Sequence, residues 1–382
     1  MSSKWPSPIT GESLAERFVD TGRTTFGLEE EIMVLHPETL DLLPRGVELL
    51  EGLDDRFKAE LPAAHVEIAS SPATGFDALA RELAECRRLL ADHMGDRARL
   101  AVAGVHPFSD RFGVVNAGER YRLLLAKYGD VVRQQLVCGL HLHVGLGGPD
   151  RTLAVYNAMR SYLPAISALA VNSPIYCGED TTLASMRPLL SGMLPRMGVP
   201  PPLESFDDYA YALNWGIERG RMGRPAEWWW EMRLHGALGT LEIRVPDGQT
   251  TLQEALAIGA VAAGTAVWLA DRYDACDLPP TAPSWQINEN RWSALHAGMK
   301  ATLIDLETGD LRPVADSVDE LFDQIGPAVA RLGGTEHLAQ ARLIAGNTGA
   351  ERQRELFNAS GARAGAVTEW LAGRFLEGLD RG

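Results

Sequence analysis

The stretch Leu136-Val-Cys-Gly-Leu-His-Leu-His-Val-Gly-Leu146 alternates apolar residues with histidine and glycine. Because successive side chains of a β-strand point to opposite faces, this alternation predicts a strand with two unlike faces. One face is apolar and suits a protein core. The other carries His141 and His143 between Gly139 and Gly145. Two imidazoles on one strand face are candidate metal or phosphate ligands, although such pairs also occur as ordinary structural residues.

The segment Thr25–Leu35 is a second predicted strand and contains three consecutive glutamates. Glu29 and Glu31 share one face, whereas Glu30 lies on the opposite, otherwise apolar face and needs a partner that the sequence does not identify. Neighbouring carboxylates repel one another, and a divalent cation would relieve that repulsion. A solvated edge strand is the alternative, but the apolar residues opposite indicate that the sheet is covered on that side.

Two shorter predicted strands repeat this design. His65–Ala69 carries Glu67 on its polar face, and Gly239–Val245 carries Glu242 and Arg244. Four strands that each set carboxylates or imidazoles opposite an apolar face are difficult to explain as solvated surface. Carboxylate oxygens with an imidazole nitrogen suit Mg²⁺ or Mn²⁺ better than zinc, although a zinc site at the two histidines stays open as an alternative.

Two arginines are candidates for contacts with an anionic substrate. Arg244 shares a face with Glu242 and is well placed to bind a transferring phosphoryl group, with a simple salt bridge to Glu242 as the alternative. Arg187 lies in Ser173–Asp208, a proline-rich segment of weak periodicity that we expect to be an active-site lid. An ordinary surface arginine is the alternative there.

The chain has 382 residues, 46% of them hydrophobic, which is enough for a large core. Its net charge of −15 argues against nucleic-acid or anionic-membrane partners, which need clustered basic residues. The four cysteines form no CxxC pair, so a disulfide framework or zinc knuckle is not expected. With no apolar signal core at the N-terminus, a cytoplasmic protein is expected.

The remaining pattern is mainly helical and indicates a mixed α+β protein. Apolar residues at helical spacing predict helices over Leu79–Met94, Leu153–Val171 and Thr251–Asp271. A further short helix is expected near Val47–Phe57, and the aromatic run Trp228-Trp-Trp230 is expected to pack or to form a pocket wall. We expect residues 1–24 to be a peripheral lead-in and residues 25–382 to form one catalytic domain.

Several motifs in this order resemble carboxylate–amine ligases of the YbdK type, within the glutamate–cysteine ligase 2 group of the glutamine-synthetase-like superfamily. The similarity extends from about Phe26 to Phe357. The segments that carry it are Gly27-Leu-Glu-Glu-Glu31, Cys138-Gly-Leu-His-Leu-His-Val-Gly145, Asn172-Ser-Pro174, Ala184-Ser-Met-Arg187, Thr240-Leu-Glu-Ile-Arg-Val-Pro-Asp247 and Gly346-Asn-Thr-Gly-Ala-Glu-Arg-Gln-Arg354.

The resemblance implies a curved antiparallel sheet, a half-barrel or funnel backed by helices, that binds ATP and Mg²⁺ or Mn²⁺. The metal ligands that it implies are Glu29, Glu31, Glu67, His141 and Glu242. Arg244 and Arg187 would contact the phosphoryl group or the carboxylate substrate, and His143 would contact phosphate or support a ligand.

The reaction that the resemblance implies is ATP-dependent joining of a small carboxylate, typically glutamate, to an amine. A carboxylate becomes a competent acyl donor when the γ-phosphoryl group of ATP is transferred to it, and the amine then attacks the acyl phosphate. Cysteine is the amine that the family's usual name implies. The alternatives are a phosphotransferase on the same scaffold, a zinc hydrolase using the His-x-His pair, and a non-catalytic nucleotide-binding protein. A homo-oligomer is left open.

Overall fold

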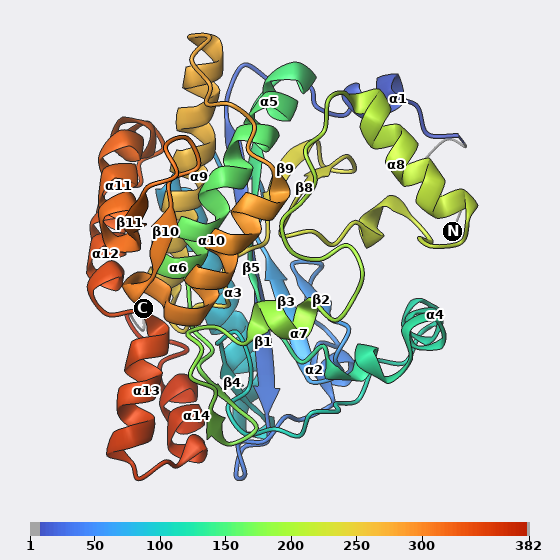
Figure 1. Cartoon of the computed structure of the whole chain (residues 1–382). Coiled ribbons are helices and arrows are strands. Elements are labelled where there is room, and N and C mark those ends of the chain that lie inside the picture. Colours follow the sequence, from blue (N-terminus) through green and yellow to red (C-terminus); the bar gives the residue numbers. More distant parts are fainter. Residues whose placement is uncertain (1–7, 380–382) are drawn as a thin grey trace.

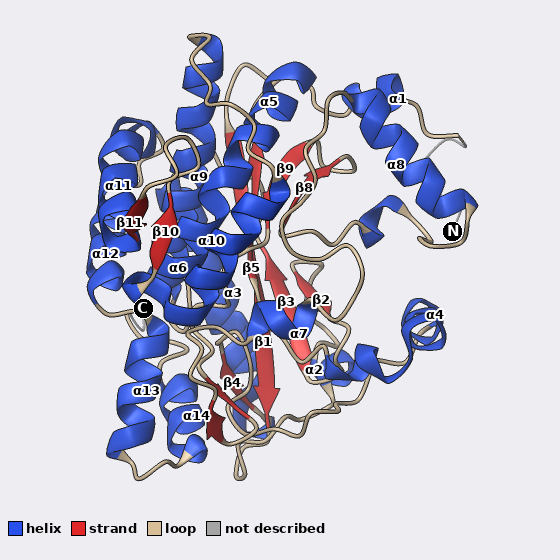
Figure 2. Cartoon of the chain, viewed as in Figure 1, coloured by secondary structure: helices blue, strands red, loops and turns tan. Residues whose placement is uncertain are grey.

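The computed structural model describes residues 8–379, and at its centre lies a seven-stranded sheet (Figures 1 and 2). Six strands follow one another in the order β2 (Phe57–Ala59), β3 (His65–Ala69), β1 (Thr25–Leu35), β5 (Leu140–Gly145), β9 (Thr240–Ile243) and β8 (Met232–His235). β4 (Arg99–Ala101) pairs with the end of β1. All these pairings are antiparallel, and the sheet is open, with β2 and β8 at its edges.

The apolar face of the sheet packs against helices, chiefly α9 (Leu252–Asp274). Leu28 of β1 lies against this helix at Gly259, where a Cβ would stand 3.1 Å from a Leu28 methyl group, so glycine permits the close approach. α9 is long and apolar enough to cross a membrane, but 89% of that apolar stretch is buried inside the protein. It is therefore the central core helix.

The other helices surround α9 or extend the two ends of the sheet (Figure 1). Those that pack on α9 are α3 (Phe76–Met94), α5 (Pro149–Met159), α6 (Leu163–Leu169), α11 (Val314–Arg331) and α12 (Thr335–Gly346), and α10 (Ser284–Ala297) packs on α6. The remaining helices are α1 (Gly11–Ala15), α2 (Gly46–Leu49), α4 (Glu119–Tyr128), α7 (Arg187–Ser191), α8 (Phe206–Glu218), α13 (Gly349–Ala359) and α14 (Ala364–Gly373). Two small hairpins, β6–β7 (Ile175–Tyr176, Glu179–Asp180) and β10–β11 (Thr302–Ile304, Leu311–Pro313), complete the fold.

The second face of the sheet is apolar only at one end. Met33 and Leu35 continue the face of Glu29 and Glu31, and both are fully buried in a cluster with α13 and α14. This cluster closes the polar face at the end of β1. The carboxylates therefore occupy a limited region rather than a whole solvated surface.

The predicted α+β class and the antiparallel sheet are confirmed, with local corrections. Leu153–Val171 is not one helix but α5, a 3₁₀ turn over Arg160–Tyr162 and α6. Pro164 lies in the first turn of α6, where a missing N–H costs little. The helix expected near Val47–Phe57 is reduced to the four residues of α2, because the chain turns there into the edge strand β2.

The predicted N-terminal lead-in lies partly outside the described residues, since the description begins at residue 8. Its described part contains α1, which packs on α8, and just after α1 the ring of Phe18 lies 5.3 Å from that of Phe206 in α8. The Ile9 amide also donates to Oδ1 of Asn214 at 3.0 Å. The division of the chain at residue 24 stays a prediction.

Candidate functional site

The strand register brings the sequence-predicted polar residues together on one face. Glu29 lies opposite His141, Glu31 opposite Glu67, and His143 opposite Glu242. Directly opposed residues of antiparallel strands project to the same side of the sheet. Six side chains from four strands, far apart in sequence, thus converge: Glu29, Glu31, Glu67, His141, His143 and Glu242.

Glu29 lies between the two histidines. Its carboxylate oxygens are 3.4 Å from Nδ1 of His141 and 3.5 Å from Nε2 of His143. Burial alone would raise the pKa of Glu29, but the two imidazoles hold it well below its usual value. Burial lowers the pKa of His141, and Arg244 lowers it further, so this imidazole tends to be neutral and able to act as a ligand.

A second group of carboxylates surrounds Lys58. Its ammonium lies 3.0 Å from Glu67 and 4.0 Å from Glu29. Burial and the charges of Glu29 and Glu31 raise the pKa of Glu67 to about 7, against the opposing effect of Lys58. The Lys58 ammonium is therefore an internal cation that partly neutralises these carboxylates.

Glu60, which the sequence analysis missed, belongs to this second group. Its carboxylate lies close to those of Glu31 and Glu67, and burial together with these two charges raises its pKa well above its usual value. Lys58 and Glu60 are two residues apart at the end of β2 and so share one face of the strand. This spacing is the sequence signal that could have identified Glu60.

Glu242 is fully buried beneath two arginines. Arg233 and Arg244 both bond to its carboxylate, and Nη2 of Arg233 lies 3.2 Å from Oε1. Burial alone would raise the pKa of Glu242, but these guanidinium groups hold it well below its usual value. The salt bridge weighed for Arg244 is therefore present. Arg233 was missed with its strand β8, although Met232-Arg-Leu-His235 has the alternation of a strand.

Arg187 reaches the same site from α7. Its guanidinium donates to the carbonyls of Arg244 at 3.1 Å and Val245 at 3.3 Å. A Cβ at Gly139 would overlap this guanidinium and lie 2.8 Å from Nε2 of His141, so glycine is needed where the two side chains meet. Arg187 is buried, which contradicts the alternative of a surface arginine.

The segment before Arg187 is anchored, which corrects the expectation of a lid over the whole of Ser173–Asp208. Asp247 accepts hydrogen bonds from the hydroxyls of Ser173 (2.7 Å) and Ser185 (2.9 Å) and from the backbone N–H of Asn172 (2.8 Å). Both serines are completely buried. Prolines and weak periodicity mark irregular backbone, and here that backbone is fixed by a buried carboxylate rather than free to close.

The site is suited to divalent cations. Ligand atoms of three residue groups lie within 4.8 Å of one another: Glu29, His143 and Glu242; Glu29, Glu67 and His141; and Glu31, Glu60 and Glu67. The Nε2 atoms of His141 and His143 are buried without a hydrogen-bond partner. Mostly carboxylate oxygens with unpaired imidazole nitrogens fit Mg²⁺ or Mn²⁺. His143, expected only as a supporting contact, is thus also in position to act as a ligand.

Two arginines beside these carboxylates have no ion pair among the described residues. Arg120 lies over the Tyr121 ring, 5.5 Å from its centroid, and opposes the pKa rise of Glu60. Burial and the nearby charge of Arg120 lower the pKa of Arg224. Both side chains are exposed, so they add positive charge beside the carboxylates and are free to contact an anion from solution.

The aromatic run and two of the cysteines have structural roles. Trp228 is buried against Tyr209 and Trp230, with ring centroids 5.5 and 6.3 Å away. Cys86 and Cys138 are buried free thiols whose pKa is raised by burial. Neither feature supplies a nucleophile or a base-stacking surface.

Comparisons with known proteins place nearly the whole chain in one family. The model of the glutamate–cysteine ligase family 2 matches residues 25–372. A protein of Salinispora arenicola, named as a candidate glutamate–cysteine ligase 2, is 33% identical over 92% of this chain and 95% of its own length. A relative from Gloeobacter violaceus with the same name is 31% identical over 93% of this chain and 98% of its own length.

Solved structures share the fold at low sequence identity. The glutamate–cysteine ligase of Francisella tularensis, crystallised with AMP, superimposes with a TM-score of 0.65 at 14% identity, covering 95% of this chain and 91% of its own. The bifunctional glutathione synthetase of Pasteurella multocida gives 0.62 at 16% identity, covering 96% of this chain and 54% of its own. The glutamate–cysteine ligase-like fold is therefore confirmed, and with the match over nearly the whole length, the chain belongs to the glutamate–cysteine ligase family 2, a family of carboxylate–amine ligases.

Proposed function

We propose that the protein is an ATP- and Mg²⁺-dependent ligase that joins the carboxylate of an amino acid, glutamate, to an amine, cysteine, through an acyl phosphate. The observation that carries the proposal is the convergence of carboxylates, imidazoles and two arginines on one sheet face of a chain of this family. Small-molecule substrates and a cytoplasmic location are parts of the same proposal.

The metal ligands in this proposal are Glu29, Glu31, Glu67, His141 and Glu242, with Glu60 and His143 added by geometry. Bound divalent cations neutralise nucleotide phosphates and polarise the phosphoryl group that is transferred. Because the carboxylates greatly outnumber the imidazoles, the donor set favours Mg²⁺ over the zinc hydrolase considered above.

The arginines act on the anionic reactants. Arg244 neutralises charge that develops on the transferring oxygens, while its own position is fixed by Glu242. Arg187 lies beside the Arg244 carbonyl and close to His141. From this position its guanidinium would bind the carboxylate of the substrate. Arg120 and Arg224 provide the remaining positive charge at the site, for the nucleotide phosphates or the second substrate. Binding both reactants in line is itself a large part of catalysis by such enzymes.

The proposal is tested by trapping the activated carboxylate. The protein is incubated with ATP, Mg²⁺, one amino acid and hydroxylamine, which attacks an acyl phosphate and gives a coloured hydroxamate. We expect ADP and hydroxamate in equal amounts with glutamate, and loss of both when Glu67 is replaced by Gln.

The other outcomes identify the alternatives. ADP release with a stable phosphorylated product and no hydroxamate would show a phosphotransferase. Hydrolysis that needs zinc and no nucleotide would show a zinc hydrolase. ATP binding without turnover for any pair of carboxylate and amine would show a non-catalytic protein.

A further inference from the structure

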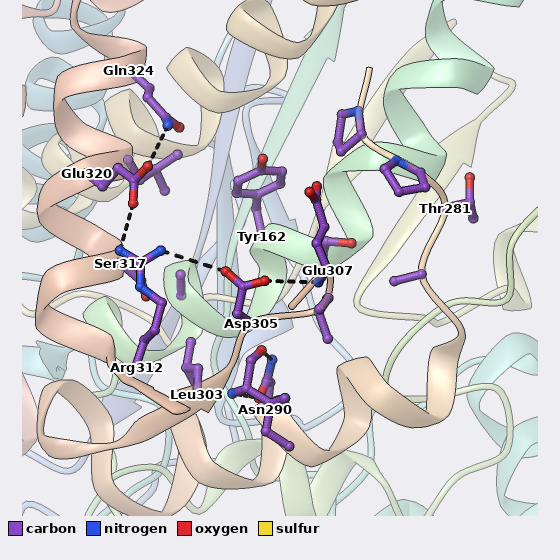
Figure 3. Close-up of a pocket in the computed structure, with 18 of the residues that line it drawn as sticks. Tyr162, Thr281, Asn290, Leu303, Asp305, Glu307, Arg312, Ser317, Glu320 and Gln324 are labelled. Atoms are coloured by element: carbon purple, nitrogen blue, oxygen red, sulfur yellow. Dashed lines mark hydrogen bonds and ion pairs between the residues drawn. The ribbon is translucent and has the colours of Figure 1, made fainter. Parts of the chain in front are cut away.

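A cavity of about 550 Å³ lies among the helices behind the sheet, away from the catalytic face (Figure 3). Its walls come from the turn before α6, from α9, α10 and α11, from the segment between α9 and α10, and from the β10–β11 hairpin. None of the residues assigned above to metal or substrate lines it. Small-molecule sites are typically cavities of roughly 300–1,000 Å³, so this one is large enough for a ligand.

One wall carries charges that are satisfied within the protein. Arg312 lies 2.9 Å from Glu320 and 3.8 Å from Asp305, and Gln324 donates to Glu320 at 3.1 Å (Figure 3). The Asp305 carboxylate also accepts backbone N–H groups of its own turn. These side chains have little capacity left for a ligand and chiefly shape the wall.

Glu307 is different. It lines the cavity from the β10–β11 turn, close to Tyr162 in Figure 3. Among the described residues its carboxylate has neither an ion pair nor a hydrogen bond. An unpaired carboxylate in a ligand-sized cavity provides a place for a cationic group.

A guanidinium group also lines the cavity. Arg272 stacks on Trp268, 5.2 Å from the ring centroid, and Trp268 meets Tyr162 edge-on at 5.5 Å. Nε of Arg272 pairs with the exposed Asp277 at 3.1 Å, and the guanidinium also bonds to the Tyr162 hydroxyl, which leaves further terminal N–H groups to bind a carboxylate. Burial raises the pKa of Tyr162, Arg272 opposes this, and Glu307 and Glu320 add to it. Arg272 and Glu307 therefore both act on the Tyr162 hydroxyl, and both line the same cavity.

We propose that this cavity binds a zwitterion of the size of a short peptide. The ligand's ammonium group pairs with Glu307, its carboxylate with Arg272, and the chain between them lies on Trp268 and Tyr162. The three carboxylates and two guanidinium groups of the lining disfavour an anion such as a nucleotide. The charged walls equally disfavour an apolar ligand, because burying these groups without partners is costly.

The test uses trialanine as the probe and isothermal titration calorimetry of the full chain without nucleotide. N-acetyl-trialanine lacks the ammonium group, and trialanine amide lacks the carboxylate. We expect trialanine to bind and each modified peptide to bind about tenfold more weakly, because each loses one charge-assisted pair. Absence of trialanine binding at millimolar concentration, or equal affinity for all three peptides, would overturn the proposal.

Variants assign each end of the ligand to its partner. Glu307→Gln should remove the preference for trialanine over its N-acetyl form, and Arg272→Gln the preference over its amide. Glu369→Gln and Arg331→Gln are the matched controls, because both residues are exposed and outside the cavity. Glu67→Gln, in the catalytic site, should bind trialanine normally, and loss of binding there would place the peptide at the sheet instead. Glu307 is exposed, so its variant is a sound test even if Arg272→Gln misfolds.

Discussion

The three consecutive glutamates of β1 lie in two different environments, one on each face of the sheet. Glu30, on the helix-covered face, is 1% exposed and paired with the fully buried Arg87. The remaining N–H groups of that arginine donate to backbone carbonyls, among them that of Phe375 at 2.9 Å. Glu29 and Glu31, on the other face, lie among further carboxylates, where Lys58 and the two histidines are ionic neighbours and the Gly139 N–H donates to Glu31.

The difference separates charge that stabilises the fold from charge that binds a ligand. At Glu30 every charge and donor has an internal partner, so the group needs nothing from solution. On the opposite face, the carboxylates of Glu29, Glu31, Glu60 and Glu67 lie close together with Lys58 in contact with two of them, and two imidazole nitrogens have no hydrogen bond. Carboxylates brought together in this way are stabilised by bound cations or protons.

The largest expected effect comes from breaking the buried ion pair between Glu30 and Arg87. Arg87→Met leaves Glu30 as a buried, unpaired charge and should lower the free energy of unfolding by about 3–5 kcal/mol. Urea denaturation measures this, with Arg81→Met on the exposed side of the same helix as the control. Ligase activity per folded molecule should hardly change. A loss below about 1 kcal/mol would mean that water reaches Glu30 and that the contrast between the two faces is weaker than described.

The next effect comes from the unsatisfied face. Glu29→Gln should reduce the rate of hydroxamate formation by about 10²–10³, the usual cost of removing one group that stabilises transition-state charge. Thermal stability should fall less than activity, because the imidazoles that stabilise the Glu29 carboxylate are weaker partners than the buried guanidinium at Glu30. Glu30→Gln, one residue away, is the matched control and should show the reverse pattern. Near-normal activity of Glu29→Gln would remove Glu29 from the proposed metal site.

The contrast also explains what the sequence could predict. Strand alternation is a local, two-residue period, so it correctly put Glu29 and Glu31 on one face and Glu30 on the other. The same rule grouped Glu67, the two histidines and Glu242, and the register confirms their shared face. The partner of Glu30 could not be found in this way, because Arg87 is 57 residues distant and lies on an otherwise apolar helix face.

Short strands and irregular segments account for the other misses. β2 has only three residues, too few for a clear period, so Glu60 was overlooked, whereas Arg233 was missed although the four residues of β8 alternate. The anchoring of Ser185 by Asp247 joins residues 62 apart. Composition describes such a segment as irregular, but only its tertiary hydrogen bonds decide whether it moves.

Asp247→Asn should have a moderate effect, since it weakens the anchor of the segment that carries Arg187. We expect kcat to fall about tenfold, the lower end of what supporting residues usually cost. KM for the carboxylate should rise if Arg187 binds it. Ser185→Ala, which removes one donor and leaves the carboxylate, should change both constants less. Unchanged kinetics in Asp247→Asn would assign this network to stability alone.

The smallest effect should come from replacing Lys58, the internal cation of the carboxylate-rich face. Its ammonium lies 3.0 Å from Glu67 and is half exposed, so it acts as an internal cation that an incoming metal must displace. Exposed pairs contribute about 0.2–1 kcal/mol, so Lys58→Met should tighten Mg²⁺ binding by up to about fivefold. Calorimetry without nucleotide measures this, with Lys127→Met, whose partner is Glu227, as the control. Weaker binding in Lys58→Met would mean that Lys58 holds the carboxylates in place for the metal. In that case the carboxylates on the face of Glu29 and Glu31, like Glu30, would depend on an internal charge partner. The two faces would then differ only in degree.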